Sequence, residues 1–202
     1  EGVWAPENYS GRFFGPTRLR TGLIKSRNLI SIRLLRAMGI RHAIDHAARF
    51  GFDTERLPRD LTLALGSGAI TPLELATGYT VFANGGFRVD AHFLQRIEDR
   101  DGRILYEANP ERVCPDCDEA VPAGLRGAGH LIARIGLPGL PVPEPRAERP
   151  AERVLPPENV YQMNSMLRDV VKEGTGRGAL ALGRDDLAGK TGTTNQQVDA
   201  WF

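Results

Sequence analysis

The sequence predicts an α+β fold, because helical and strand patterns occupy different parts of the chain. Apolar residues recur at helical spacing in stretches at 17–38, 41–50, 71–83 and 158–172. Strand patterns occupy 87–98, 103–107 and 187–194. Helices and strands that are grouped in this way are typical of α+β proteins.

The composition is that of an ordinary globular protein. The 202 residues are enough for one sizeable core, with 41% hydrophobic and 25% charged residues. The net charge of +1, from 26 basic and 25 acidic residues, argues against a strongly basic nucleic-acid-binding protein. No apolar run approaches the ~20 residues of a membrane-spanning helix. The chain starts at Glu1 without a methionine and stops inside an apolar run, so we expect a segment of a longer protein.

The first helical region pauses at a junction that carries two polar side chains. A helix is predicted from Thr17, and helical spacing resumes at Leu29 until Gly39 stops it. Ser26 and Asn28 lie between the two helices. Both side chains can point into a cleft, or they can cap the helix ends, since serine and asparagine are preferred caps.

The next helices carry local signals. Arg41–Phe50 is predicted as a short helix, and an apolar run follows at 61–67. Thr71-Pro72-Leu73-Glu74 has the sequence of a capping box with proline at the first helical position. A helix is therefore predicted from there to about Ala83.

A hairpin, a proline-rich stretch and a long helix follow. Strands are predicted at 87–98 and 103–107, around a turn at Asp101-Gly102. Residues 109–157 contain ten of the fourteen prolines and show little periodicity, so we interpret them as an insertion or linker. Strong amphipathic spacing predicts a helix at 158–172.

The stretch Ala188–Asn195 offers the clearest chemistry. Lys190 lies among two glycines and three threonines, on a predicted strand. Such a strand edge can hold an extended, anionic substrate by main-chain pairing, with its carboxylate near the lysine and the threonine hydroxyls. A phosphate loop would need glycine five residues before Gly189-Lys190, where Arg184 stands. A glycine-rich surface turn remains the other interpretation of this stretch.

Three further patterns carry weaker signals. Cys114 and Cys117 can be loop residues, a local disulfide or half of a metal site. His42 and His46 are spaced i,i+4, but no third ligand accompanies them, so we predict no metal site. The stretch 174–179 fits G-x-G-x-x-A, yet it follows a helix rather than a strand. We interpret it as a turn and predict no cofactor.

Two short motifs form a pair across the chain. Lys190-Thr191-Gly192 is the third of the three motifs of serine penicillin-recognising enzymes, which are S-x-x-K, S-x-N and K-T-G. Ser26-Arg27-Asn28 supplies an S-x-N about 160 residues earlier. The order and the wide spacing make the pair far more specific than either motif alone.

The chain resembles the transpeptidase domain of class A (bifunctional) penicillin-binding proteins. The stretches that carry the resemblance are Trp4–Gly11, Ser26–Leu29, Ala64–Gly68 with Thr71–Ala76, Val81–Gly86, Glu173–Gly176 and Gly189–Thr194. The resemblance implies a penicillin-binding protein/β-lactamase-like fold, with a helical region beside an antiparallel sheet and the active site between them. We expect it to be incomplete at both ends.

The predicted domain organisation follows from the same resemblance. Residues 1–108 are predicted to belong to the transpeptidase domain, as its helical part with the S-x-N motif and the first hairpin. Residues 109–157 are the insertion, although the resemblance itself already resumes at 155. Residues 158–202 return to the transpeptidase domain with a helix and the K-T-G strand.

The resemblance also implies the reaction of a serine-type D,D-transpeptidase. A serine attacks the penultimate D-Ala carbonyl of a peptidoglycan stem peptide, D-Ala leaves, and an amine of a neighbouring stem attacks the acyl-enzyme. β-Lactams resemble D-Ala-D-Ala and leave a stable acyl-enzyme. The implied setting is the periplasmic side of the bacterial inner membrane, in a protein with an N-terminal membrane anchor and a glycosyltransferase domain, and without a nucleic-acid partner.

Catalytic and binding roles are implied for both motifs. Ser26 takes part in proton transfer to the leaving group, Asn28 hydrogen-bonds the substrate amide, and Lys190 supplies positive potential beside Ser26. The implied substrate-binding residues are Thr191, Gly192, Thr193 and Thr194, in which the hydroxyls of Thr191 and Thr193 bind the substrate carboxylate. The backbone N–H of Thr193 is the implied second oxyanion donor, and one such donor contributes roughly 3–4 kcal/mol.

One motif of the family is missing from these residues. The lysines are Lys25, Lys172 and Lys190, and the residues three places before them are Gly22, Asp169 and Leu187. None of these is serine, so S-x-x-K is absent, and in the family it precedes the Trp4 segment. We therefore expect the nucleophile in a preceding part of the parent protein and predict that this chain alone is inactive.

Two other functions stay open at this point. The same fold and motifs serve β-lactamases and D,D-carboxypeptidases, in which the acyl-enzyme is released by water. A non-catalytic relative could instead bind a peptide or a partner in the same groove. A Ser-x-x-Lys sequence upstream of Glu1 would decide between a catalytic and a non-catalytic protein.

Overall fold

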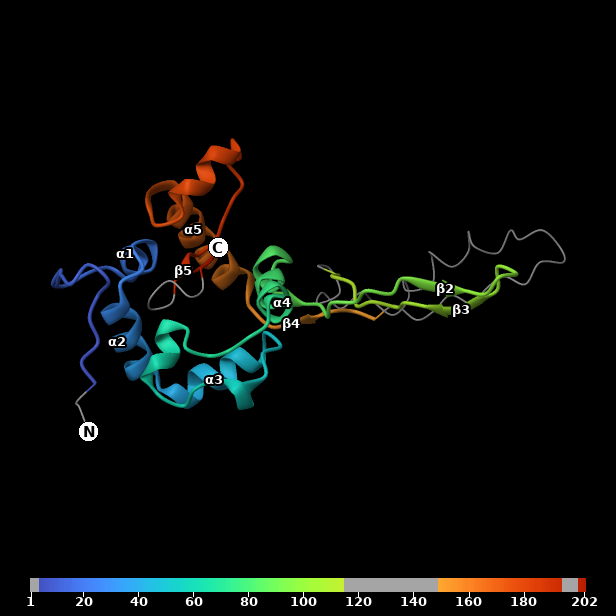
Figure 1. Ribbon diagram of the computed structural model, residues 1–202, viewed down its shortest axis with the longest axis horizontal. Helices are drawn as coiled ribbons and strands as arrows, with labels where there is room; N and C mark the ends of the chain where they lie inside the picture. The colour runs from blue at the N-terminus through green and yellow to red at the C-terminus, as the bar shows by residue number, and fades with distance from the viewer. Residues whose placement is uncertain (1–3, 115–148, 194–199) are drawn as a thin grey trace, which may run out of the picture. The chain divides into compact units, whose positions relative to one another are not determined.

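The computed structural model describes residues 4–114, 149–193 and 200–202 (Figure 1). The chain divides into two compact units. The first unit is Glu1–Arg88 with Val154–Phe202, and the second is Val89–Arg153. Helices and short antiparallel strand pairs both occur, which confirms the predicted α+β class.

The first unit contains all the helices that the described residues form. Its described α-helices are α1 (Leu19–Ile24), α2 (Asn28–Met38), α3 (Ile40–Ala48), α4 (Pro72–Ala83) and α5 (Pro157–Glu173). Its described 3-10 helices are η1 (Thr54–Arg56), η2 (Leu61–Leu65) and η6 (Arg177–Leu182), and its strands are β1 (Phe87–Arg88), β5 (Gly192–Thr193) and β6 (Ala200–Trp201). In the part of the chain that the structure describes, none of the helices has the length and apolar character needed to cross a membrane.

The capping box at the start of α4 is confirmed. The Thr71 hydroxyl accepts a hydrogen bond from the Glu74 backbone N–H at 3.2 Å, and the Glu74 carboxylate accepts one from the Thr71 N–H at 2.6 Å. The hydrogen bonds from Thr71 lower the pKa of Glu74. The box satisfies two N–H groups that the first helical turn cannot pair internally.

The core of the first unit joins α4 to the segment that leads into α5. Its buried members are Phe50, Val81, Val154, Leu155 and Val160, and Phe52 and Phe82 pack against them. At the edge of this cluster the Gly86 carbonyl accepts hydrogen bonds from the Val154 N–H at 2.8 Å and the Leu155 N–H at 3.1 Å. A Cβ at Gly86 would lie 2.3 Å from the Leu155 carbonyl oxygen, so only glycine fits there.

Helix α1 packs against α5, although the two helices are far apart in the sequence. Arg20 of α1 donates to the Asp169 carboxylate at 2.5 Å and to the Ser165 hydroxyl at 3.1 Å. Asn164, also in α5, donates to the carbonyl of Phe82 at 3.1 Å. Helix α5 is thus bonded through Ser165 and Asp169 to the start of α1, and through Asn164 to α4.

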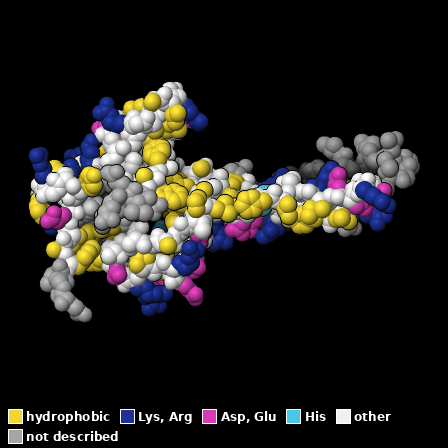
Figure 2. Space-filling view, in the orientation of Figure 1, with side chains coloured by type: hydrophobic (Ala, Val, Ile, Leu, Met, Phe, Trp, Pro, Cys, Tyr) yellow, Lys and Arg dark blue, Asp and Glu magenta, His cyan; other side chains and the backbone are white. Residues whose placement is uncertain are grey.

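The second unit contains a hairpin of β2 (Arg96–Glu98) and β3 (Ile104–Glu107), and the short strand β4 (Glu152–Arg153). The hairpin is antiparallel, with Ile97 opposite Tyr106 and a bulge at the next position. Its side chains are exposed on both faces, including Ile104 and Leu105. Figure 2 shows hydrophobic side chains along this hairpin at the surface.

Two predicted strands are shorter than their sequence patterns. The predicted strand 87–98 is regular only at 87–88 and 96–98, because residues 89–95 belong to no described ladder. Of the predicted strand 187–194, the described residues 187–193 are regular only at Gly192–Thr193, which pairs with two residues of β6. A strand needs a partner for its backbone groups, and a local pattern does not supply one.

The proline-rich stretch lies mostly outside the described residues, which omit 115–148. Its described ends come together in an isolated parallel bridge between Arg112 and Pro150. Val154 and Leu155, which the predicted boundary places in the insertion, are buried in the core of the first unit. The predicted domain boundaries remain a prediction.

Candidate active site

The S-x-N motif forms the tight junction between α1 and α2. Ser26 has a positive φ of 50°, and its N–H donates to the Leu23 carbonyl at 3.1 Å. Asn28 is the first residue of α2. Neither Ser26 nor Asn28 holds a cap position, because the C-cap of α1 is Lys25 and the N-cap of α2 is Arg27. The Asn28 Nδ2 instead donates to the Glu7 carbonyl at 3.0 Å.

Lys190 of the K-T-G motif lies against this junction. Its Nζ donates to Ser26 Oγ at 2.8 Å and to the carbonyl oxygen of Thr191 at 2.7 Å. Burial of the ammonium group lowers the pKa of Lys190. The fold therefore places a half-buried cation in direct contact with a serine hydroxyl from the other end of the chain.

The residues after Lys190 form the predicted substrate strand in part. Thr191 precedes β5, and Gly192 and Thr193 are its two residues, both exposed. In the antiparallel pair Gly192 lies opposite Trp201, and Thr193 lies opposite Ala200. Thr194, the last of the predicted substrate-binding residues, lies outside the described residues.

One residue of this cluster was missed by sequence reasoning. The Thr175 hydroxyl lies 2.5 Å from the Thr191 hydroxyl, so the turn after α5 reaches the K-T-G segment. The sequence signal was the stretch Glu173–Gly176, which we interpreted as a turn and as part of the family resemblance, without assigning a binding role to Thr175. Asn28, in contrast, is only two positions after Ser26 in the sequence. Its described hydrogen bond goes to the Glu7 carbonyl of the N-terminal segment.

Arg27, the middle residue of the S-x-N motif, packs away from Lys190. Its guanidinium lies 3.4 Å from the centroid of the Phe14 ring, in a cation–π contact. Both residues line a pocket of about 140 Å³ together with Phe13, Ile30 and Arg33. The Asn8 side chain accepts from the Leu29 N–H at 3.3 Å, so the N-terminal segment is fixed on α2.

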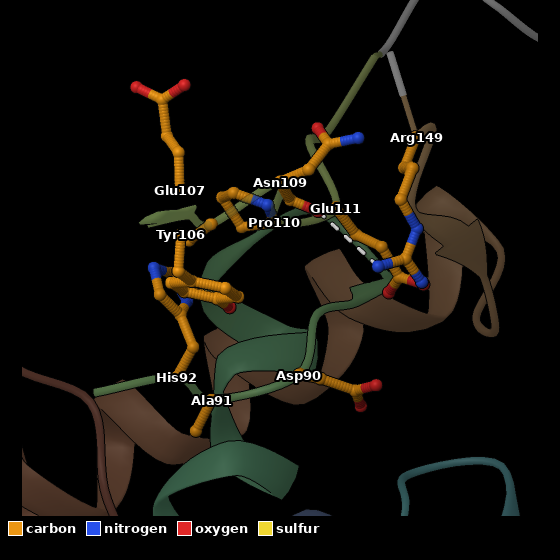
Figure 3. A pocket seen from close by; sticks show the side chains of 10 residues that line it. Asp90, Ala91, His92, Tyr106, Glu107, Asn109, Pro110, Glu111 and Arg149 are labelled. Carbon is orange, nitrogen blue, oxygen red and sulfur yellow. Dashed lines mark hydrogen bonds and ion pairs between the residues drawn. The ribbon is translucent and has the colours of Figure 1, made fainter. Parts of the chain in front are cut away.

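A second pocket, of about 390 Å³, lies wholly within the second unit (Figure 3). Arg149 spans part of it, donating to the Glu111 carboxylate at 3.1 Å and to the Asn109 carbonyl at 3.4 Å. His92 and Tyr106 line it as well. It contains none of the residues that the sequence motifs single out.

The histidine and cysteine patterns do not assemble a metal site in the described residues. No group of three or more His, Cys, Asp or Glu side chains there is placed to hold a metal ion. The ring of His46 makes an edge contact with Phe50 at 5.4 Å, and burial, with Arg49 and His42, lowers the pKa of His46. Cys114 is disulfide-bonded, and Cys117 lies outside the described residues.

The chain matches the family model of the penicillin-binding protein transpeptidase domain over residues 3–200. It belongs to the penicillin-binding protein transpeptidase family. Penicillin-binding protein 1A of Pseudomonas aeruginosa is 46% identical over 214 residues, which cover 99% of this chain and 26% of that protein. Penicillin-binding protein 1A of Neisseria meningitidis is 41% identical over 200 residues, which cover 99% of this chain and 21% of that protein.

Solved structures agree with this transpeptidase fold. The crystal structure of penicillin-binding protein 1A from Haemophilus influenzae superposes with a TM-score of 0.80 at 32% identity, over 100% of this chain and 30% of that one. The D,D-transpeptidase domain of a peptidoglycan glycosyltransferase from Eggerthella lenta has a TM-score of 0.63 at 19% identity, over 96% and 45% of the two chains. The second likeness concerns the fold alone. This transpeptidase chain thus spans about a quarter of the curated relatives named here.

Proposed function

We propose that this chain is part of a peptidoglycan D,D-transpeptidase that cross-links stem peptides through an acyl-serine intermediate and is acylated by β-lactams. The observation that carries the proposal is the 2.8 Å hydrogen bond from Lys190 Nζ to Ser26 Oγ. It joins the S-x-N and K-T-G motifs of a chain that belongs to this family. Two polar groups 164 positions apart thereby form one pair.

Ser26 and Lys190 suit proton transfer to the leaving group. Lys190 donates to Ser26 Oγ, which leaves the serine's own O–H proton available for another acceptor. The nearby positive charge favours loss of that proton and stabilises negative charge that develops in the transition state. We assign Ser26 the transfer of a proton to the departing amine and Lys190 the supporting cation.

Asn28 suits recognition of the substrate amide. Its Nδ2 is held by the Glu7 carbonyl at 3.0 Å, which fixes the orientation of the side-chain amide. We assign its Oδ1 as the acceptor for a backbone N–H of the stem peptide. The N-terminal segment would then act as the support of this residue.

The K-T-G strand suits an extended substrate. In the described part of the chain β5 pairs with β6 alone, so its other edge can take a peptide as a further strand. Thr193 is exposed there, and we assign its N–H to the oxyanion and its hydroxyl, with that of Thr191, to the substrate carboxylate. We propose Gly192 and Thr194 as further substrate-binding residues, of which Thr194 lies outside the described residues.

The nucleophile and the cellular setting belong to the whole protein. We propose that the S-x-x-K serine comes from outside residues 1–202, in a protein that also has a glycosyltransferase domain and a membrane anchor. The site would then work on the periplasmic side of the inner membrane. The partial coverage of the relatives, 21% to 26%, is consistent with such a longer protein.

Labelling with a fluorescent penicillin tests the proposal. We expect the complete protein to form a covalent adduct that survives SDS, and residues 1–202 alone to form none. Lys190→Ala in the complete protein should slow acylation about 100-fold, within the range of proton-transfer contributions. Lys172→Ala is the matched control, because this lysine lies in the last turn of α5 and is exposed, and it should leave acylation unchanged.

Each contrary result has a distinct meaning. Labelling of the short chain would locate a nucleophile among its own serines and would overturn the role given to Ser26. An adduct of the complete protein that hydrolyses within seconds would favour a β-lactamase. If the complete protein forms no adduct, the non-catalytic peptide-binding alternative replaces the transpeptidase.

A further inference from the structure

The hydroxyls of Thr175 and Thr191 form a pair beside Lys190. Their oxygens are 2.5 Å apart, although the residues are separated by 16 positions in the sequence. Thr175 is exposed, and Thr191 is half-buried. The K-T-G motif accounts for Thr191 but gives no reason for a second hydroxyl at this place.

The backbone of Thr175 is fixed by the end of α1. Its N–H donates to the Ile24 carbonyl at 3.3 Å, and the Lys25 ammonium donates to the carbonyl of Glu173. A Cβ on Gly174 would lie 2.4 Å from the Ile24 oxygen, so the turn approaches α1 as closely as a backbone can. The position of Thr175 is therefore built into the packing of α1 on α5.

Thr191 is held in place by contacts of its neighbouring residues, one of which is to α5. The N–H of Gly189 donates to the Leu167 carbonyl of α5 at 3.3 Å, and Lys190 holds the Thr191 carbonyl at 2.7 Å. The ring of Phe202 closes against the two glycines, since a Cβ on Gly176 or Gly189 would approach it to about 3 Å. Both hydroxyls are thus presented by one rigid support.

Hydrogen-bond accounting shows what this pair can do. Each hydroxyl has one proton to donate and can also accept. Whichever threonine donates to the other, one of the two protons remains for a third group. A hydroxyl that accepts a hydrogen bond becomes a stronger donor. Lys190 has two described hydrogen-bond partners, the Ser26 hydroxyl and the Thr191 carbonyl, and both are neutral. The natural third group is an anion that approaches the Lys190 ammonium.

We propose that Thr175 is a positioning residue, whose hydroxyl hydrogen-bonds that of Thr191 and directs the remaining hydroxyl proton to the carboxylate of a peptide substrate or a β-lactam. This inference rests on the proposed function and adds to it a residue outside both motifs. Thr175 sets the direction of the Thr191 proton, and Lys190 supplies the charge. Loss of the Thr175 hydroxyl leaves the Thr191 hydroxyl free to rotate away from the carboxylate.

The test compares a β-lactam that has a free carboxylate with its neutral methyl ester. The readout is the second-order rate constant of acylation, measured on the complete protein. Thr175→Val, which is nearly isosteric, should lower acylation by the acid about tenfold, as expected for the loss of one hydrogen bond to a charged group. Acylation by the ester should change less than twofold, and Thr175→Ser should restore the rate with the acid.

A double variant adds an independent check. Thr191→Val should show the same loss with the acid, and Thr175→Val combined with Thr191→Val should lose little more than Thr191→Val alone, because the two hydroxyls act as one unit. Equal losses with acid and ester, or additive losses, would overturn the inference and leave Thr175 a structural residue. No adduct with the unchanged protein would overturn the proposed function, and the inference with it.

Discussion

At the scale of single residues, Ser26 combines a strained backbone with a side chain of the candidate site. Among the described residues it is the one non-glycine residue with a positive φ, at 50°. This conformation costs an L-residue roughly 1 kcal/mol, because Cβ crowds the following carbonyl oxygen. In this conformation the Ser26 hydroxyl accepts a hydrogen bond from Lys190 at 2.8 Å, and backbone strain of this kind is common at functional sites.

Two substitutions separate the strain from the hydroxyl. Ser26→Gly and Ser26→Ala both remove the acceptor of Lys190, but only glycine adopts a positive φ without crowding. We expect Ser26→Gly to be more stable than Ser26→Ala by about 1 kcal/mol in urea unfolding, while both acylate equally poorly. If Ser26→Ala is as stable as Ser26→Gly, the junction relaxes on mutation and carries no stored strain.

At the scale of elements, the contact between α1 and α5 requires glycine at position 174. The requirement comes from the lack of room for a side chain, and not from the backbone dihedral angles. Gly174 has φ −102°, which any residue can adopt. Its Cβ, however, would lie 2.4 Å from the Ile24 carbonyl and 2.7 Å from the Val170 carbonyl. Backbone atoms cannot move aside as a flexible side chain can, so the two helices would have to separate.

We predict that Gly174→Ala destabilises the protein by about 1–3 kcal/mol, the usual cost of overpacking. It should also move Thr175 and weaken the preference for the β-lactam acid over the ester. Gly178→Ala is the matched control, because no atom lies within 4 Å of a Cβ there. Thermal unfolding and acylation of both variants check this, and a Gly174→Ala protein as stable as Gly178→Ala would contradict it.

The elements also show what sequence can predict. The capping box at Thr71 and Glu74 and the end of α2 at Gly39 were predicted well, because their signals lie within a few residues. The strand around Lys190 was predicted too long, since its extent depends on a partner strand. Thr175 could not be assigned, because its hydrogen bond depends on how α5 packs against α1 and the K-T-G segment.

The candidate site was predictable for a different reason. Ser26 and Lys190 were singled out by motifs that resemble a family, and nothing local in either stretch indicates that their side chains meet. The structure brings these two together and turns the Asn28 amide towards Glu7. The catalytic and binding roles of all these residues remain proposals that the labelling experiments decide.

At the scale of the whole molecule, the residues that this chain contributes to the candidate site belong to the first unit. Ser26, Thr175 and Lys190 all belong to Glu1–Arg88 or Val154–Phe202. The chain leaves this unit after Arg88 and returns to it at Val154. These two points are close together, since the Gly86 carbonyl accepts a hydrogen bond from the Val154 N–H at 2.8 Å. A segment that leaves and re-enters a unit at neighbouring points can be replaced without stretching the remaining fold.

We therefore predict that a short Gly-Ser linker can replace residues 89–153 in the complete protein, with penicillin acylation kept within a fewfold. Replacement of the sequence-predicted insertion, 109–157, should fail, because it removes Val154 and Leu155, which are 2% and 5% exposed in the core. Each large core side chain typically contributes about 2–5 kcal/mol. Acylation and thermal unfolding of the two variants decide the boundary. If the protein with 109–157 replaced is acylated and the protein with 89–153 replaced is not, the hairpin belongs to the functional transpeptidase domain.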